Sequence, residues 1–215
     1  MNKKEIMTYI DHTILKATTS WDEVKKLCDE AITHSTASVC IPPSYVKQAK
    51  EYVGEKMKIC TVIGFPLGYN TSNSKIVEAK EAISNGADEI DMVINLGFVK
   101  NKELDKVRDE ISKLKEVVGD KILKVIVETC YLTEEEKISL CKCVTDGGAD
   151  YIKTSTGFGT GGASLEDIEL FKKHIGPKVK IKASGGIKSK EELEEYIKAG
   201  CQRIGTSSAI KMLQG

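Results

Sequence analysis

The feature of this sequence that most constrains its fold is a short apolar run that recurs eight times, in alternation with helical patterns. In segments 21–34 and 102–118 apolar residues repeat every three or four positions, so each predicted helix has one apolar face. Strands that alternate with helices pair in parallel through right-handed crossovers. The apolar runs are YIDHT (9–13), SVCI (38–41), KICTVIG (58–64), EIDMVIN (89–95), LKVIVET (123–129), YIKTS (151–155), KIKAS (180–184) and RIGTS (203–207).

Eight such units predict an α/β fold, a single (β/α)8 TIM barrel over residues 1–215, which is compact for that fold. No Pro/Ser-rich linker or low-complexity tract divides the chain, so we expect one domain. Several helices are expected to begin at Ser or Thr caps, as at Thr133, Ser164 and Ser189. An open doubly wound sheet is the alternative, but it usually has fewer strands, and no GxGxxG follows the first run.

Composition argues against several classes of function. The chain has 32 basic and 32 acidic residues, so no net charge favours nucleic acid or an anionic membrane. No stretch approaches the roughly 18 apolar residues of a membrane span, and the basic N-terminus lacks the apolar region of a signal peptide. Seven cysteines without a CxxC pair indicate reduced thiols and a cytoplasmic protein. His12, His34 and His174 are widely scattered, which disfavours a metal site.

Two lysines lie inside apolar runs, where a charge is costly. Lys153 follows Ile152, and Lys182 follows Ile181. Alternate strand residues face the helices or the barrel interior, so outward isoleucines place both lysines inward, and the same alternation turns Asp91 inward. One such lysine could lie at a sheet edge or in a buried ion pair. Two lysines and an aspartate on three inward strands favour a functional site instead.

These three residues have the chemistry of a Schiff-base enzyme. A free lysine is protonated at neutral pH and is no nucleophile, but desolvation and a neighbouring ammonium group favour the neutral amine. A neutral amine can add to a carbonyl and form an imine. The protonated imine draws electrons from the adjacent carbon, so a carbon–carbon bond beyond it can break or form. Asp91 and the second lysine can move the protons that this reaction requires.

Glycine-rich segments suggest that the substrate carries a phosphate. STGFGTGG (155–162), SGG (184–186) and GTSSA (205–209) can each expose backbone N–H groups. The last two follow the seventh and eighth apolar runs, which is a usual phosphate position in barrels. Paired glycines alone are weak support, because Gly185 could simply permit a positive φ angle.

Together these segments resemble one known family. GFPLGYNTS, NGADEIDMVIN, VIVETCYLT, YIKTSTGF and KASGGI are similar to the motifs of the deoxyribose-phosphate aldolases, in the same order. The resemblance runs from DHTILKATTS at residue 11 to GTSSA at residue 205, nearly the whole chain. It implies a class I aldolase that interconverts 2-deoxy-D-ribose 5-phosphate with D-glyceraldehyde 3-phosphate and acetaldehyde, in deoxyribose phosphate degradation.

The resemblance also implies roles for individual residues. Lys153 would form the Schiff base, Asp91 would donate and accept protons, and Lys182 would be its partner and favour the neutral amine of Lys153. We expect no cofactor and no metal, small phosphorylated sugar and aldehyde substrates, no nucleic-acid or membrane partner, and a homo-oligomer. Residues expected to bind phosphate or line the pocket are Asp11, Thr13, Cys40, Thr156, Gly157, Gly185, Gly186, Gly205, Ser207 and Ser208.

Some positions depart from the family pattern. Phe158 stands where some longer relatives carry a lysine near the phosphate, so that contact must come from elsewhere or be missing. Cys40 is followed by Pro42 and Pro43 where many relatives have one proline, and it is equally well explained as a small buried hydrophobe.

Two other functions stay open. Another phosphate-binding barrel, an isomerase or a metal-dependent aldolase, would use Lys153 and Lys182 as charge stabilisers. A barrel retained for ligand binding or as a scaffold would be marked by the loss of one of the three polar residues, and none is lost.

Overall fold

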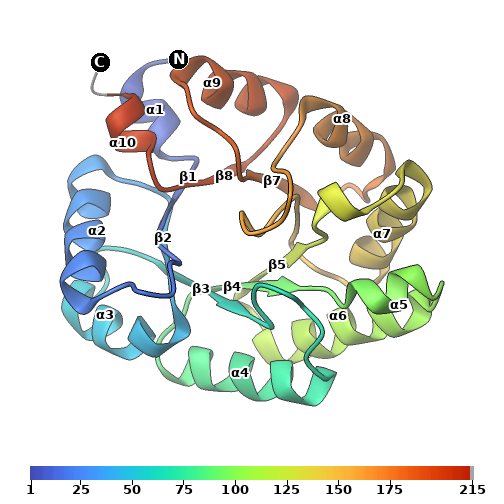
Figure 1. Ribbon diagram of the computed structural model, residues 1–215. Helices are drawn as coiled ribbons and strands as arrows, with labels where there is room; N and C mark the ends of the chain where they lie inside the picture. The colour runs from blue at the N-terminus through green and yellow to red at the C-terminus, as the bar shows by residue number, and fades with distance from the viewer. Residues whose placement is uncertain (214–215) are drawn as a thin grey trace.

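The computed structural model describes residues 1–213, in which parallel strands close into one barrel in sequence order. Figure 1 shows the strands at the centre with the helices around them. The barrel closes where the Ile204 N–H donates to the Tyr9 carbonyl at 2.8 Å. The predicted (β/α)8 barrel is confirmed, and the open doubly wound alternative is wrong. The strands are β1 (Ile10–Thr13), β2 (Ser38–Ile41), β3 (Ile59–Ile63), β4 (Glu89–Val93), β5 (Ile122–Ile126), β6 (Tyr151–Lys153), β7 (Lys180–Ser184) and β8 (Arg203–Thr206).

The helices begin where the sequence supplies capping side chains. Thr133 and Glu136 form a reciprocal capping box, and Ser164 and Ser189 each accept a hydrogen bond from the third residue of their helix. The three predicted caps are therefore confirmed. The α-helices are α1 (Lys3–Met7), α2 (Trp21–His34), α3 (Val46–Val53), α4 (Ser72–Ser84), α5 (Leu96–Lys100), α6 (Leu104–Val118), α7 (Glu134–Asp146), α8 (Leu165–His174), α9 (Lys190–Ala199) and α10 (Ala209–Met212), and the 3-10 helices are η1 (Pro43–Tyr45) and η2 (Thr129–Tyr131).

The hydrophobic core lies between the barrel and the helices. Ile90, Ile152 and Ile181 belong to this core and are buried, as the outward strand positions require. The residues that follow them point the other way, into the barrel. None of the helices among residues 1–213 combines the length and the apolar run needed to cross a bilayer.

A buried ion pair joins α4 to α6 beside the end of β4. Lys75 Nζ lies 2.9 Å from Glu110 Oε2, and both side chains are almost completely buried. Lys75 also donates to the Val93 carbonyl at 2.8 Å, and Ser72 donates to the other Glu110 oxygen at 2.9 Å. The pair thus fixes the last residue of β4, the strand that carries Asp91.

Lys75→Met should lower the free energy of unfolding by about 3–5 kcal/mol, because it leaves the Glu110 carboxylate buried without a cation. Replacing both residues by Met removes the buried charges together and should recover most of the loss. Urea unfolding of the parent, the single variant and the double variant measures both effects. A double variant as unstable as Lys75→Met would contradict the ion-pair account.

Candidate active site

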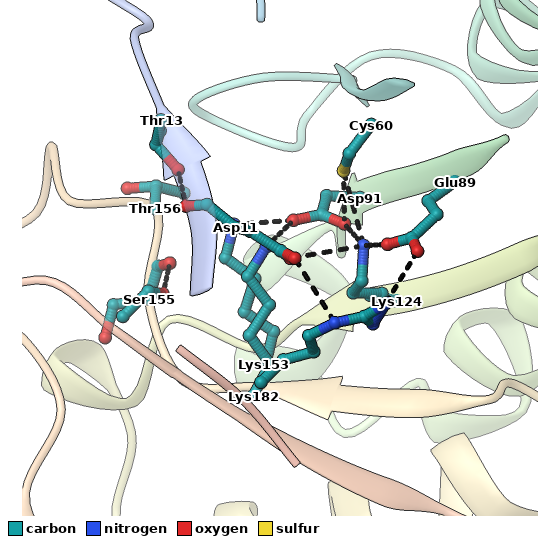
Figure 2. A network of polar contacts seen from close by, with 12 residues as sticks. Asp11, Thr13, Cys60, Glu89, Asp91, Lys124, Lys153, Ser155, Thr156 and Lys182 are labelled. Carbon is teal, nitrogen blue, oxygen red and sulfur yellow. Dashed lines mark hydrogen bonds and ion pairs between the residues drawn. The ribbon is translucent and has the colours of Figure 1, made fainter. Parts of the chain in front are cut away.

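The barrel interior holds a network of charged side chains rather than an apolar plug. Figure 2 shows Asp91 among the lysines, which reach it from several strands. All members of the network are buried because they occupy inward strand positions. The strand register sets Asp91 beside Lys124 and Lys153 beside Lys182. The network contains four cations, Lys124, Lys153, Lys182 and Arg203, and three carboxylates, Asp11, Glu89 and Asp91.

Asp91 is the centre of this network. Its Oδ2 accepts hydrogen bonds from Lys153 and Lys182, each at 2.8 Å, and its Oδ1 accepts one from Lys124 at 2.8 Å. Burial alone would raise the pKa of Asp91, but the ammonium groups of Lys124, Lys153 and Lys182 outweigh it and hold this pKa well below its usual range. The resting group is therefore a carboxylate at neutral pH and carries no proton to donate.

Lys182 and Lys124 are held as cations. Lys182 Nζ lies 2.5 Å from Asp11 Oδ2 and 2.8 Å from Asp91 Oδ2. Burial works to lower the pKa of Lys182, but these two carboxylates outweigh burial and raise it above its usual value. For Lys124, burial is likewise outweighed by Asp91 and its other anionic neighbours, so its pKa is raised well above its usual value.

Lys153 differs from the other three cations. Within residues 1–213 its Nζ lies at ion-pair distance from one carboxylate only, at the oxygen of Asp91 that Lys182 also contacts. Lys124, Lys182 and Arg203 each contact at least two carboxylates among the described residues. Lys153 is also the member of the network that lines the cavity at the barrel mouth. Its amine is thus the least compensated of the four cations, and it faces the cavity.

The cavity has a volume of about 330 Å³ and lies at the carboxyl ends of the strands. Gly185 and Gly186 have φ angles of 80° and 79°, which glycine adopts without strain. A Cβ atom on Gly205 would lie 3.1 Å from Lys182 Cε, so glycine there leaves room for that lysine. The cavity brings together Lys153 with the predicted Thr13, Thr156, Gly157, Gly185, Gly186, Gly205, Ser207 and Ser208.

Asp11 and Cys40 lie deeper than the sequence suggested. Both were expected to line the pocket, but both are fully buried and neither belongs to the cavity wall. Inside the barrel Asp11 binds Lys182, while Cys40 packs against Cys60 and Val62. Phe158 lies on the rim, half-exposed, with its ring edge-on to Phe65 at 5.3 Å between centroids.

Sequence reasoning missed Lys124, Glu89 and Arg203. Lys124 Nζ lies 2.6 Å from Glu89 Oε2 as an ion pair, without the geometry of a hydrogen bond, and Arg203 Nη2 donates to Glu89 Oε1 at 2.8 Å. The same strand alternation that revealed Lys153 could have found all three, because each occupies an inward position of its run.

Among the described residues, two buried groups each bring three possible metal-donor atoms within 4.8 Å of one another. One group is Cys40, Cys60 and Asp91, and the other is Asp11, Cys60 and Glu89. The carboxylates of both groups already face ammonium or guanidinium groups. A divalent cation would have to compete with those bound positive charges, so the donor set does not suit one.

A family model described as DeoC/LacD family aldolase matches residues 5–213. The chain belongs to this aldolase family. It is 62% identical over 215 residues to the deoxyribose-phosphate aldolase of Clostridium botulinum (strain Alaska E43 / Type E3), covering 100% of this chain and 97% of that protein. Its identity to the deoxyribose-phosphate aldolase of Clostridioides difficile (strain 630) is 61% over 211 residues, 98% of this chain and 96% of the relative.

Solved structures agree with this membership. The aldolase superposes on the tetrameric deoxyribose phosphate aldolase of Aeropyrum pernix with a TM-score of 0.91, at 30% identity, covering 99% of this chain and 91% of that one. For a structure named QR15, an aldolase, the TM-score is 0.93 at 40% identity, with 98% and 95% covered. The family resemblance and the expected class of enzyme, a class I aldolase, are therefore confirmed. Membership of a family of aldolases argues against the isomerase and scaffold alternatives.

The buried carboxylates should make the stability of the aldolase depend on acid pH. The pKa of an unfolded aspartate is about 3.9, and the lysines hold the pKa of Asp91 below it. The resulting stabilisation is fully present above the unfolded value and is lost as pH falls through the folded one. Between about pH 4 and pH 2, the free energy of unfolding of Asp91→Asn should decline by about 2 kcal/mol less than that of the parent. Urea unfolding across this range measures both slopes, and equal slopes would contradict the charge assignment.

Proposed function

We propose that this aldolase reversibly cleaves 2-deoxy-D-ribose 5-phosphate to D-glyceraldehyde 3-phosphate and acetaldehyde, through a Schiff base on Lys153. The observation that carries the proposal is the network of four cations and three carboxylates, in which Lys153 alone reaches the cavity and is least compensated. The network balances when one lysine is neutral, and a neutral amine at Lys153 is the nucleophile that the reaction needs.

Imine formation begins when the neutral Lys153 amine attacks the C1 aldehyde of the open-chain sugar. The addition gives a carbinolamine, which loses its hydroxyl group as water and becomes a protonated imine. The ammonium group of Lys182 lies beside Lys153 on the same Asp91 oxygen and supplies the proton that leaves with the water. Asp91 is a carboxylate in the resting site, so we assign it the role of proton acceptor and Lys182 that of donor.

Carbon–carbon cleavage then follows from the protonated imine. The C3 hydroxyl gives its proton to the base at Asp91, the C2–C3 bond breaks, and its electron pair moves to C2 and neutralises the iminium as an enamine. D-Glyceraldehyde 3-phosphate leaves. The proton that Asp91 took from the C3 hydroxyl is transferred to C2 of the enamine. Addition of water to the resulting protonated imine releases acetaldehyde, restores the Lys153 amine and returns a proton to Lys182. Deoxyribose phosphate degradation is the process that this reaction serves.

The phosphate would be held by backbone donors at the far end of the cavity. Within residues 1–213 the N–H groups of Gly157, Gly186 and Ser207 donate to no protein acceptor. These groups belong to the loops after β6, β7 and β8, which meet around the cavity. Lys16 and Lys188 line the same cavity and can supply the positive charge that Phe158 does not.

We also propose that the aldolase is a cytoplasmic homo-oligomer. The tetramer of the Aeropyrum pernix relative supports assembly. The seven cysteines are unpaired in the structure, which suits a reducing compartment.

Borohydride reduction with acetaldehyde should leave a stable ethyl adduct on Lys153, because the imine forms there. Peptide mass mapping locates the adduct. Lys153→Arg keeps the positive charge and should abolish trapping, while Lys121→Arg, on the protein surface, should trap normally. An adduct confined to Lys182, or no adduct at all, would overturn the assignment.

Lys182→Met should shift imine formation to more alkaline pH. The substitution removes a cation beside Lys153 and leaves Asp91 and Asp11 with less positive charge around them, so both effects favour the protonated form of Lys153. The pH at which half of the enzyme is trapped in a single turnover should rise by about one unit or more. An unchanged profile in a folded variant would limit Lys182 to proton transfer or substrate contact.

A further inference from the structure

Glu128 occupies a strained and buried place at the barrel mouth. It follows β5, immediately before η2, with φ 56° and ψ 67°, in the left-handed region that non-glycine residues rarely adopt. Its neighbours fix this conformation, because the Val127 and Thr129 N–H groups donate to the carbonyls of Lys153 and Thr154, each at 3.0 Å. Such backbone strain persists where the surrounding structure determines it, often at functional sites.

In the described part of the chain, the Glu128 carboxylate accepts hydrogen bonds only from the loop that follows Lys153. It accepts the Thr156 N–H, at 3.1 Å to Oε1 and 3.3 Å to Oε2, and the Thr156 hydroxyl also donates to it. No ammonium or guanidinium of the described residues lies within 4 Å of it. Burying a carboxylate without a nearby cation costs free energy, and these hydrogen bonds are what offsets that cost.

Through Thr156, the carboxylate fixes the cavity wall. The Thr156 hydroxyl accepts the Phe158 N–H at 3.0 Å, so Thr156 connects Glu128 to the segment that carries Gly157. Thr156, Gly157 and Phe158 all line the cavity that contains Lys153. Glu128 is also in close contact with the loop after β6 at Gly159, where an added Cβ atom would lie 3.2 Å from Glu128 Cδ.

These contacts restrict what Thr156 can do for a ligand. Both of its donors, the N–H and the hydroxyl proton, are engaged by Glu128. The hydroxyl retains one acceptor site beyond the one used by Phe158. Thr156 can therefore accept a hydrogen bond from a substrate hydroxyl but has no donor left for a phosphate, which leaves the Gly157 N–H as the phosphate donor of this loop.

We propose that Glu128 is a positioning residue for phosphate recognition, which holds the 156–158 loop so that the Gly157 N–H faces the 5-phosphate. The inference rests on the proposed function, because it assigns this loop to the same substrate. Glu128 itself does not touch substrate, since its carboxylate is engaged by Thr156 behind the cavity wall.

The test compares 2-deoxyribose 5-phosphate with unphosphorylated 2-deoxyribose in Glu128→Ala, Glu128→Gln and the surface control Glu116→Gln. Glu128→Ala should lower kcat/KM for the phosphorylated sugar roughly 10- to 100-fold, mainly through KM, because charge-assisted hydrogen bonds that order the loop are lost. For 2-deoxyribose the change should be less than about threefold, since no phosphate is bound. Glu128→Gln keeps an acceptor for the Thr156 N–H and should lie between Glu128→Ala and the parent, and Glu116→Gln should match the parent.

The coupling to Thr156 gives a second measurement that does not need Glu128→Ala to fold. Thr156→Val should cost the phosphorylated sugar more than 2-deoxyribose, because both sugars lose the contact with the hydroxyl but only the phosphorylated one loses the ordered loop. Thr156→Ser, which keeps the hydroxyl, should approach the parent. Glu128→Gln and Thr156→Val together should cost less than the sum of their separate effects. Equal losses for both sugars, or additive effects, would overturn the proposal. A parent that fails to cleave 2-deoxyribose 5-phosphate would instead refute the proposed function.

Discussion

One carboxylate, Asp91, binds three ammonium groups in the middle of a closed barrel, and the chemistry of the site depends on it. Its two oxygens contact Lys124, Lys153 and Lys182, each at 2.8 Å. That shared anion offsets the cost of burying three lysines so close together. The closed barrel makes the arrangement possible, because adjacent parallel strands hold the inward positions in a fixed register.

The lysines of the network differ in the number of their carboxylate neighbours, and a Schiff-base enzyme requires such a difference. Lys124 contacts three carboxylates and Lys182 contacts two, and both are held as cations, while Lys153 shares one oxygen of Asp91 with Lys182. The apolar stabilisation comes from the layer between barrel and helices, so the interior is free to carry charge. The Glu128 carboxylate lies outside the cavity and orders the 156–158 loop on the cavity wall through its contact with Thr156.

The local sequence pattern predicted much of the fold but only part of the site. The alternation of apolar runs with helical patterns gave the eight-stranded barrel, and strand alternation turned Lys153, Lys182 and Asp91 inward. Alternation alone does not say how deep an inward residue lies, so Asp11 and Cys40 were expected on the cavity wall and are buried beneath it. Contacts such as Lys182 to Asp11, 171 residues apart, depend on barrel closure, which no local pattern records. The place of Glu128 could not be predicted, because it results from a left-handed backbone conformation that a glutamate rarely adopts.

The central claim is that carboxylate neighbours hold Lys124 and Lys182 as cations beside the Lys153 amine. Nuclear magnetic resonance titration of ¹⁵N-labelled lysine side chains measures the charge of each group directly, with each Nζ signal assigned by its disappearance in a Lys→Arg variant. The account predicts that the Lys124 and Lys182 signals remain those of ammonium groups at a pH where an ordinary surface lysine has titrated, because their carboxylate neighbours raise their pKa values. A Lys124 or Lys182 signal that changes to that of a neutral amine below the pH at which a surface lysine titrates would contradict it.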